Sequence, residues 1–335
     1  MTAFELYLKR NAKKFDAYLA EFFADGTHAD MQRYLYRPLG AYTKNAGKRH
    51  RPLICLLACE AVGGDPRRAW PSAAAIEHFH TAALIHDDIM DSSLTRRGEP
   101  CLHIREGEGL AINAGDLALS LVTGTVVDDH GLDPECRLRV LKELVDMTTR
   151  TIEGQALDIG WARDDRFDLT VDDYLVMANH KTAFYSGAVP LAVGAIIGVG
   201  TEEQVEALRA FGLAAGLAFQ IQDDVLNLVG TREATKKDFR SDVTEGKRTL
   251  AAVHALQHSA ERERLREILA SRAEDPALLD EAVRIMAEAG SIDFARTYAR
   301  DLVLGAKAEL EAALPRGKAR DLLLSMADFF VERDS

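Results

Sequence analysis

Two short acidic clusters, each set in a long apolar stretch, hold the residues best suited to chemistry. The first reads DDIMD, so Asp87, Asp88 and Asp91 follow an apolar run that ends in a histidine. Asp87 and Asp91 stand four positions apart and therefore share one face of a helix. Like charges at this spacing destabilise a bare helix, and partial burial increases that cost. A divalent cation bound by both carboxylates removes the repulsion.

The second cluster repeats this design in the segment FQIQDDVLN, from Phe219 to Asn227. Asp223 and Asn227 share a helical face, and Phe219 and Gln220 lie one turn earlier on that side. A solvated helix face explains either cluster alone better than a metal site does. Two clusters of one form, both inside apolar sequence, favour metal sites that clamp one diphosphate. Ligands that are all oxygen suit Mg²⁺, with Mn²⁺ as a substitute, and Mg²⁺ binds one or two carboxylates plus substrate phosphates.

A rival metal interpretation uses Glu77 and His80, which form the Glu-x-x-His unit of di-iron carboxylate bundles. That centre requires a second such unit. No other histidine in the sequence has a glutamate three residues before it. The di-iron interpretation is therefore much the weaker one.

Basic residues stand near both acidic clusters, although the chain as a whole is acidic. The segment GKRHRP, from Gly47 to Pro52, precedes an expected helix whose free N–H groups favour anions. The segment RRGEP, from Arg96 to Pro100, follows the first cluster and predicts a turn that places two guanidinium groups beside the metals. Each basic residue alone fits a solvated surface charge, so their order along the chain carries the inference. The other candidates are Lys181, Thr182, Lys237 and Lys247.

Apolar residues recur at helical spacing almost throughout the chain, which predicts an all-α fold. Between Ala73 and Met90, the side chains of Ile76, Phe79 and Ala83 fall near one stripe of the helix that carries the first cluster. No Asn-Gly or Asp-Gly turn sits between two alternating runs, so strand signals are absent. No repeat or low-complexity linker marks a boundary. We expect one domain over residues 1–335, with about ten helices.

The composition argues against several functional classes. The 335 residues carry a net charge of −12, which argues against a nucleic-acid partner because phosphate binding draws on excess Lys and Arg. The four cysteines form no CxxC pair and fit free thiols in a reducing cytosol. The start lacks a signal-peptide core, and the longest nearly apolar run, Gly187 to Gly200, is shorter than the roughly 20 residues that span a bilayer. We expect a soluble cytoplasmic protein without a stable membrane span.

The order of these motifs resembles the trans-isoprenyl diphosphate synthase family over most of the chain, from about Gly47 to Leu250. The specific pair is Asp-Asp-x-x-Asp followed by Arg-Arg-Gly, and Phe-Gln-x-x-Asp-Asp. The resemblance implies the type I isoprenoid synthase fold, a single large helical bundle around a central cavity, and a homodimer. It also implies Mg²⁺-dependent head-to-tail condensation of isopentenyl diphosphate with an allylic diphosphate, namely dimethylallyl, geranyl or farnesyl diphosphate.

The resemblance also implies a role for each residue at a motif position. The expected isopentenyl diphosphate pocket is Lys48, Arg51, His80 and Arg97. The expected Mg²⁺ ligands are Asp87, Asp91 and Asp223, supported by Asp88 and Asp224. The expected allylic-substrate contacts are Arg96, Lys181, Thr182, Gln220, Lys237 and Lys247, and Phe219 is also expected to bind substrate. The carboxylates of both clusters, Arg96 and Lys181 form the expected catalytic set. The segment Glu153-Gly-Gln155 with Asp158 also resembles a family segment near the metals.

Two positions depart from the family pattern. Asn227 stands where the second motif usually ends in Asp, and it keeps an oxygen without the charge. The family's Lys-x-x-Gly-x-Asp loop begins at Lys237 and has Arg240 at the glycine position. Arg adopts positive φ less readily than Gly. This substitution puts the geometry of the loop and the role of Lys237 in question.

Two other functions share parts of the pattern. A terpene cyclase shares the first motif and the fold, but its second metal motif usually has an Asn/Asp-x-x-Ser/Thr-x-x-x-Glu form. Positions 223, 227 and 231 match that form poorly. A non-catalytic partner subunit is expected to have lost acidic motifs, and both are intact here. The synthase interpretation is therefore preferred.

Product length is predicted from the helix that carries Asp87. Ala83 and Ala82, four and five positions before Asp87, are expected to form the upper wall of the tunnel for the growing chain, with Phe79 one turn further down. In the family, bulky aromatic residues at the two alanine positions close the tunnel for short products. The alanines favour geranylgeranyl diphosphate, with farnesyl or longer polyprenyl diphosphates as alternatives. On this view Ala82→Phe shortens the product.

Overall fold

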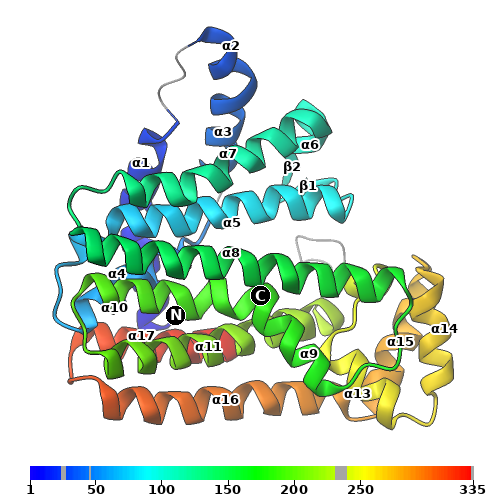
Figure 1. Ribbon diagram of the computed structural model, residues 1–335. Helices are drawn as coiled ribbons and strands as arrows, with labels where there is room; N and C mark the ends of the chain where they lie inside the picture. The colour runs from blue at the N-terminus through cyan, green and yellow to red at the C-terminus, as the bar shows by residue number, and fades with distance from the viewer. Residues whose placement is uncertain (24–27, 45–46, 231–239, 333–335) are drawn as a thin grey trace. The chain divides into compact units, whose positions relative to one another are not determined.

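The computed structural model describes residues 1–23, 28–44, 47–230 and 240–332, and these are almost entirely helical (Figure 1). The all-α prediction is therefore confirmed. The described chain forms two compact units. The first comprises residues 1–148, 189–209 and 311–326, and the second comprises residues 149–188, 210–310 and 327–335. The single-domain expectation stays a prediction.

The first unit contains most of the N-terminal half of the chain. Its elements are α1 (Ala3–Glu21), α2 (Ala29–Met31), η1 (Gln32–Tyr36), α3 (Arg37–Lys44), α4 (His50–Ala61), η2 (Pro66–Ala69), α5 (Trp70–Met90), β1 (Thr95–Arg96), β2 (Glu99–Pro100), α6 (Leu102–Glu106), α7 (Glu108–Val127) and α10 (Val189–Ile197), with parts of α8 (Pro134–Arg163), α11 (Glu202–Val229), α16 (Ser291–Ala313) and α17 (Lys318–Glu332).

The second unit holds the other parts of those four long helices and a set of shorter elements. The shorter elements are α9 (Val171–Ala178), η3 (Asn179–Ala188), α12 (Ser241–Thr244), α13 (Leu250–His258), α14 (Arg262–Ser271) and α15 (Pro276–Glu288). The helices of the described chain outnumber the ten that were expected, because several of them, such as α2 and α12, are a single turn.

Helix α5 is the central element of the first unit. Pro71 stands in its first turn, where a missing N–H costs nothing. Most of its side chains are buried, because it packs extensively against α7 and also against α4 (Figure 1). At Gly115 of α7 an added Cβ would lie 2.3 Å from Nε2 of His86 in α5. A larger residue there would have to displace the His86 ring, which adjoins the first acidic cluster.

Helix α7 is apolar along most of its length, yet only a third of its apolar window is buried. Within the described residues it is the one helix long and apolar enough to cross a membrane by composition. A core helix of a soluble protein passes the same test, and α7 does pack against α5. The run Gly187 to Gly200, singled out from the sequence, lies at the end of η3 and in α10, where every residue of α10 is buried.

A small β-hairpin follows α5 and corrects the expectation that strand signals were absent. Strands β1 and β2 pair antiparallel, with Thr95 opposite Pro100. The two-residue turn between them is Arg97–Gly98, with φ of 57° and 84°. Two positive φ values are the signature of the turn that suits the twist of a hairpin. A search for Asn-Gly or Asp-Gly overlooked it, because here an arginine takes the first left-handed position.

Close helix approaches at glycines build the second unit around η3, a π-helical stretch. An added Cβ on Gly154 of α8 would lie 2.1 Å from the backbone nitrogen of Lys181. Gly187 and Gly212 meet in the same way, since a Cβ on Gly187 would lie 2.0 Å from the carbonyl oxygen of Gly212. The π-helical turn is wider than an α-helical one and often marks a functional site. These glycines let α8 and α11 contact η3 directly.

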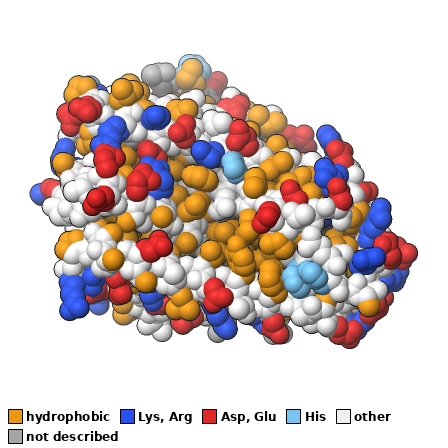
Figure 2. Space-filling model, turned by 60° about the horizontal axis from the view of Figure 1, so that its bottom comes forward, with side chains coloured by type: hydrophobic (Ala, Val, Ile, Leu, Met, Phe, Trp, Pro, Cys, Tyr) orange, Lys and Arg blue, Asp and Glu red, His pale blue; other side chains and the backbone are white. Residues whose placement is uncertain are grey.

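The surface carries charges of both signs. On the face drawn in Figure 2, Asp and Glu side chains alternate with Lys and Arg, and hydrophobic side chains lie among them. Many of these charges form ion pairs, for example Arg284 with Glu261 at 2.8 Å. On that face the charged side chains therefore form a mixed surface and are not gathered in a single acidic patch.

Candidate active site

The first acidic cluster occupies the last turn of α5. The side chain of Asp87 is 24% exposed, whereas that of Asp88 is 1% exposed. Asp91 ends the helix, and its N–H donates to the carbonyl of Asp87 at 2.9 Å. The C-terminal end of a helix carries partial negative charge, which disfavours acids and favours cations. Three carboxylates at this end do not stabilise the helix, but they suit a bound cation.

Asp88 anchors the first cluster to the surrounding helices. The hydroxyl of Tyr42 in α3 donates to one of its oxygens at 2.8 Å, and Nε of Arg96 donates to the other at 2.6 Å. Arg96 also lies 3.4 Å from Asp87. Burial alone would lower the pKa of Arg96, but Asp88 and Asp87 raise it above its ordinary value. A charged guanidinium is thus held beside the outward carboxylate of Asp87.

The residues expected to bind isopentenyl diphosphate lie in the same unit. Nη1 of Arg51 is 3.2 Å from Nε2 of His80, and because Arg can only donate, that nitrogen is the acceptor. Burial and then the charges of Arg51 and Arg97 hold the pKa of His80 well below its ordinary value, so the imidazole is neutral. Lys48 is exposed just before α4. Arg51, His80 and Arg97 thus form a group with excess positive charge near a helix N-terminus.

The second acidic cluster lies in α11 and, like the first, pairs a more exposed aspartate with a buried one. Asp223 is exposed and Asp224 is buried. The hydroxyl of Tyr174 in α9 donates to one oxygen of Asp224 at 2.8 Å, and Nε2 of Gln220 donates to the other at 2.6 Å. Burial raises the pKa of Asp224 well above its ordinary value, and the nearby charges of Asp242 and Asp223 raise it further. Both clusters therefore consist of an outward acid backed by a buried acid that a tyrosine holds.

Lys181 and Thr182 reach this cluster from η3. The hydroxyl of Thr182 donates to Oε1 of Gln220 at 2.7 Å, which extends the chain of hydrogen bonds to Asp224. Lys181 forms an ion pair with Asp158 of α8, whose side chain is 6% exposed. Asp158 belongs to the segment whose resemblance was noted from the sequence. The lysine is therefore held by a buried carboxylate in the same unit as Asp223.

Arg240, the first described residue after the second cluster's helix and its following residues, has the backbone conformation that a glycine would give. Arg240 has φ of 59°, and Nη1 pairs with Asp280 while Nε donates to the carbonyl of Leu228 at 3.2 Å. These contacts compensate the strain of a left-handed arginine. Asn227 caps the next helix, because its Oδ1 accepts from the N–H of Asp242 at 3.2 Å. The missing charge at Asn227 is thus replaced by a structural role in this loop.

Three other residues that were expected to contact the substrates differ in their surroundings. Lys247 lies 2.5 Å from Glu245 and 3.7 Å from Asp242, so a phosphate would have to share it with carboxylates. The ring of Phe219 packs edge-on against Phe330 of α17, with centroids 4.7 Å apart. Lys237 lies outside the described residues.

The residues expected to set product length differ in burial. Ala82 has no exposed surface and packs in a core cluster with side chains of α3, α6 and α7. Phe79 is likewise buried. Ala83 is partly exposed. An aromatic ring at position 82 would therefore overpack the core, whereas position 83 has room beside it. Of the two alanines, Ala83 is the better candidate for a tunnel wall.

The donor set of the two clusters fits a magnesium ion. Asp87, Asp91 and Asp223 offer oxygen ligands and are at least partly exposed. Within the described ranges no three side chains of His, Cys, Asp or Glu are close enough to form a preassembled metal site. Carboxylate oxygens are ligands that Mg²⁺ accepts, and this ion usually keeps several waters and binds substrate phosphates as well.

Sequence reasoning missed the two tyrosines that hold the buried acids. Tyr42 and Tyr174 lie 46 and 50 positions before their partners. No local motif links residues so far apart, so the only available signal was the need of a buried carboxylate for donors. The buried arginines Arg49 and Arg248, each next to an expected substrate lysine, were also missed.

The chain is similar to proteins of known activity over most of its length. The profile described as polyprenyl synthetase matches residues 32–286. A short chain isoprenyl diphosphate synthase of Methanothermobacter thermautotrophicus is 43% identical over 288 residues, which cover 86% of this chain and 87% of that protein.

Solved structures agree with the sequence relatives. The structure of a geranylgeranyl pyrophosphate synthetase from Pyrococcus horikoshii aligns with a TM-score of 0.90 at 36% identity and covers 98% of both chains. A geranylgeranyl pyrophosphate synthase from Corynebacterium glutamicum, solved with isoprenyl diphosphate and magnesium, aligns with a TM-score of 0.87 at 28% identity and covers 99% of both chains.

Proposed function

The chain belongs to the polyprenyl synthetase family and is a prenyltransferase that elongates trans-prenyl diphosphates, and from that premise we propose that its main product is geranylgeranyl diphosphate. The proposal is supported by the small residue Ala83 one turn before Asp87, which is partly exposed. A small side chain there leaves space for a chain longer than fifteen carbons. The relative from Pyrococcus horikoshii named above carries this activity in its name.

We propose that Asp87, Asp91 and Asp223 hold Mg²⁺ together with the allylic diphosphate. The single observation that carries this is the shared plan of the two clusters, in which an outward acid is backed by a buried, tyrosine-bound acid. When bound, the ions would neutralise charge on the leaving diphosphate. Arg96 and Lys181 add positive charge beside the two clusters, and such preorganised charge favours ionisation of the allylic substrate.

The second substrate, isopentenyl diphosphate, is proposed to bind at Lys48, Arg51, His80 and Arg97. The neutral imidazole of His80 adds no charge of its own, and Arg51 and Arg97 supply cations for the diphosphate. The double bond of isopentenyl diphosphate attacks the allylic cation and forms the new carbon–carbon bond. Loss of a proton from the resulting cation completes the product, and the departing pyrophosphate is available to accept it. No Ser-His or Cys-His pair is required.

The test is turnover by the purified chain with labelled isopentenyl diphosphate and each starter, followed by chromatography of the products. We expect mainly a twenty-carbon diphosphate, activity that is lost with a chelator, and recovery with Mg²⁺ or Mn²⁺. A main product of fifteen carbons, or of more than twenty, contradicts the product assignment. Cyclic hydrocarbons from an allylic substrate alone would identify a terpene cyclase. Absence of turnover by a folded chain would identify a partner subunit.

We also propose a homodimer that covers the apolar outer sides of α7 and α8. Ile112 and Val127 are exposed on α7. On α8, exposed apolar residues recur every seven positions, which places them on one side of the helix. They are Leu138, Val145, Ile152 and Ile159. A second copy of the chain offers the same surface and covers it by two-fold symmetry. The proposed location is the cytoplasm.

A further inference from the structure

Two Lys-Arg pairs share an arrangement that the proposed function does not use. In each pair the lysine is an expected substrate contact, and the arginine that follows it is almost fully buried. The pairs are Lys48–Arg49 and Lys247–Arg248. The side chain of Arg49 is 2% exposed and that of Arg248 is 1% exposed. Arginine is rarely buried in this way unless it is ion-paired or hydrogen-bonded.

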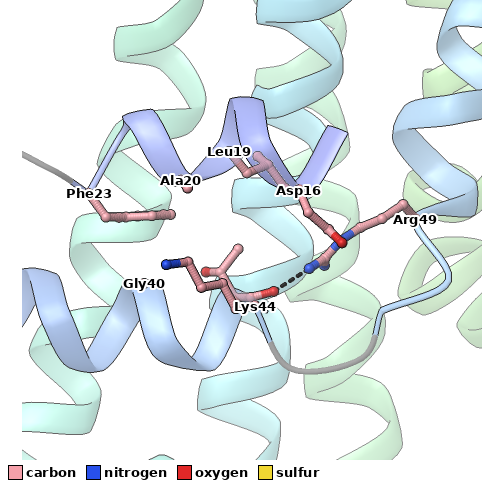
Figure 3. A pocket seen from close by; sticks show the side chains of 8 residues that line it. Asp16, Leu19, Ala20, Phe23, Gly40, Lys44 and Arg49 are labelled. Carbon is pink, nitrogen blue, oxygen red and sulfur yellow. Dashed lines mark hydrogen bonds and ion pairs between the residues drawn. The ribbon is translucent and has the colours of Figure 1, made fainter. Parts of the chain in front are cut away.

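Arg49 joins three helices of the first unit at the start of α4. Its Nε donates to Oδ1 of Asp16 in α1 at 2.7 Å, and Nη1 donates to Oε1 of Glu77 in α5 at 2.6 Å. Nη2 donates to the carbonyl of Thr43 at the end of α3. Figure 3 shows Arg49 and Asp16 pointing toward one another at the edge of a small hollow. The guanidinium therefore fixes the backbone immediately after Lys48 to α1, α3 and α5.

The backbone at Arg49 needs such support. Its φ of 52° is left-handed, a conformation that is unfavourable for a residue with a Cβ. Strained conformations persist where the surroundings fix them, and they cluster at functional sites. Glu77 stands three positions before His80 on α5, so the same ion pair also braces the helix that carries this imidazole.

Arg248 plays the corresponding part in the second unit. Its Nη1 donates to the carbonyl of Gly246, and its Nε donates to the carbonyl of Arg166 at 2.6 Å. The guanidinium lies 4.0 Å from the centre of the Phe167 ring. Gly246 has φ of 63°, so Lys247 also has a left-handed neighbour. The arginine thus ties the turn that presents Lys247 to the segment between α8 and α9.

We propose that Arg49 and Arg248 are positioning residues, each of which fixes the neighbouring lysine for one substrate: Arg49 with Lys48 for isopentenyl diphosphate, and Arg248 with Lys247 for the allylic diphosphate. A lysine ammonium sits on a flexible four-carbon stem, so its reach is set by how firmly its backbone is held. A displacement of about 1 Å at a substrate contact costs as much as about a hundredfold in rate. This inference rests on the proposed function for the assignment of the two lysines.

The test is steady-state kinetics on Arg49→Lys and Arg248→Lys, with each substrate varied in turn. Arg49→Lys keeps the charge but cannot reach Asp16, Glu77 and Thr43 at once. We expect it to raise KM for isopentenyl diphosphate about tenfold or more, with KM for the allylic substrate changed less than twofold. Arg248→Lys is expected to show the reverse pattern. The matched controls are Arg67→Lys and Arg284→Lys, because both arginines are exposed and ion-paired.

Milder variants keep the test valid if the buried substitutions unfold the chain. Asp16→Asn removes the negative charge of one partner of Arg49, and Phe167→Leu removes the ring beside Arg248. Each is expected to shift the same KM as its arginine, by a smaller factor. If both KM values rise together, or only the unfolding temperature falls, the arginines are merely structural and the proposal is wrong.

Lys48→Ala and Lys247→Ala separate this inference from the proposed function. If neither lysine variant raises KM for its own substrate, the assignment of the lysines is wrong and the positioning role falls with it. If both lysine variants raise the expected KM but the arginine variants show no substrate selectivity, the positioning role alone is wrong. Selective shifts in all four variants support both.

Discussion

In α5 the buried carboxylate of Asp88 meets a guanidinium, whereas in α11 the buried carboxylate of Asp224 meets a phenol and a carboxamide. Both are held by a tyrosine at 2.8 Å. Arg96 balances the charge of Asp88, and the two groups form an ion pair beside the outward acid. Asp224 receives hydrogen bonds from Tyr174 and Gln220, which are neutral, and its pKa is raised. The same outward geometry is therefore supported in two different electrostatic ways.

The difference shows that the orientation of a buried carboxylate and the neutralisation of its charge can come from different groups. In the first cluster the hairpin after α5 brings in a cation, because Arg96 lies in β1, eight positions after Asp88. In the second cluster the donors come from α9 and from one turn earlier in α11. Hydrogen bonds from neutral groups orient a buried acid, but they offset less of the cost of its charge than an ion pair does.

The largest expected effect is on turnover, and it tests whether the two outward acids are equivalent. Asp87→Ala and Asp223→Ala each remove an oxygen ligand from the proposed metal sites. We expect each to lower kcat by on the order of a thousandfold or more, since preorganised charge at a developing anion is worth that much. Steady-state rates are measured together with far-UV circular dichroism to show that the helices remain. Near-normal rates in both variants would falsify the metal mechanism, and a loss in only one would show that the clusters are not equivalent.

The next effect is on stability and tests the difference between the buried acids. Asp88→Asn leaves the buried charge of Arg96 without its main counter-charge, which is expected to lower the free energy of unfolding by about 3 kcal/mol or more. Asp224→Asn keeps an oxygen for the tyrosine and removes a charge that burial disfavours. Its expected change is within about 1 kcal/mol. Urea unfolding of the two variants measures both, and equal losses would contradict the distinction.

A third expectation concerns the residue one helical turn before each outward acid and its effect on product length. Four positions before Asp223 stands Phe219, whereas four positions before Asp87 stands Ala83. Ala83→Phe adds a ring on the partly exposed side of α5 and is expected to shift the main product to a shorter chain. Ala82→Phe overpacks the core and is expected to destabilise the fold by about 1–3 kcal/mol. Product chromatography and thermal unfolding of the two variants measure these two effects. A product that shortens only in Ala82→Phe would restore the original assignment.

The last expectation concerns the pH dependence of stability and compares one histidine in each unit. His78 in α5 is fully buried, and its ring nitrogens have no hydrogen-bond partner in the described chain, so burial lowers its pKa to about 3. His254 in α13 is partly exposed and bonds Ser291 at 2.9 Å. The unfolded chain binds the proton near pH 6.5, above the folded pKa of His78. Stability is therefore complete above pH 6.5 and falls as the pH drops toward 3.

The variant His78→Leu removes the contribution of His78 to that dependence, whereas buried His80 keeps its own contribution. Each pH unit between those limits is worth at most about 1.4 kcal/mol for one group. We expect His78→Leu to flatten the loss of stability on acidification, measured as urea unfolding at a series of pH values. His254→Leu is the control and is expected to leave the profile nearly unchanged. The same slope in His78→Leu and in the parent chain would contradict a contribution of His78 to the acid sensitivity.

Features that follow from the helical spacing of residues could be predicted from the sequence. Spacing of three and four residues predicted the all-α class, and it placed Asp87 and Asp223 on helices among apolar neighbours. The Arg-Arg-Gly segment after the first cluster predicted the turn that brings Arg96 to Asp88. These features are local, so the pattern of residue types contains them.

Features that depend on distant partners could not be predicted in this way. Nothing near Asp88 indicates Tyr42, because the two meet only when α3 packs against its neighbours. The π-helical turn of η3 has no periodic signature, since it inserts a residue into an otherwise helical pattern. The backbone at Arg240 also depends on a distant partner. Its ion pair with Asp280 lets an arginine occupy a left-handed position where the family pattern has glycine.

The exposed side of α7 links the behaviour of this enzyme to its concentration. Only a third of that apolar window is covered within one chain. If a second copy covers the rest, part of the folding free energy is an association free energy. By mass action the unfolding temperature then rises with the logarithm of protein concentration. Dilution would act on this protein as a mild denaturant, and two samples of the same chain would differ in heat resistance through their concentration alone.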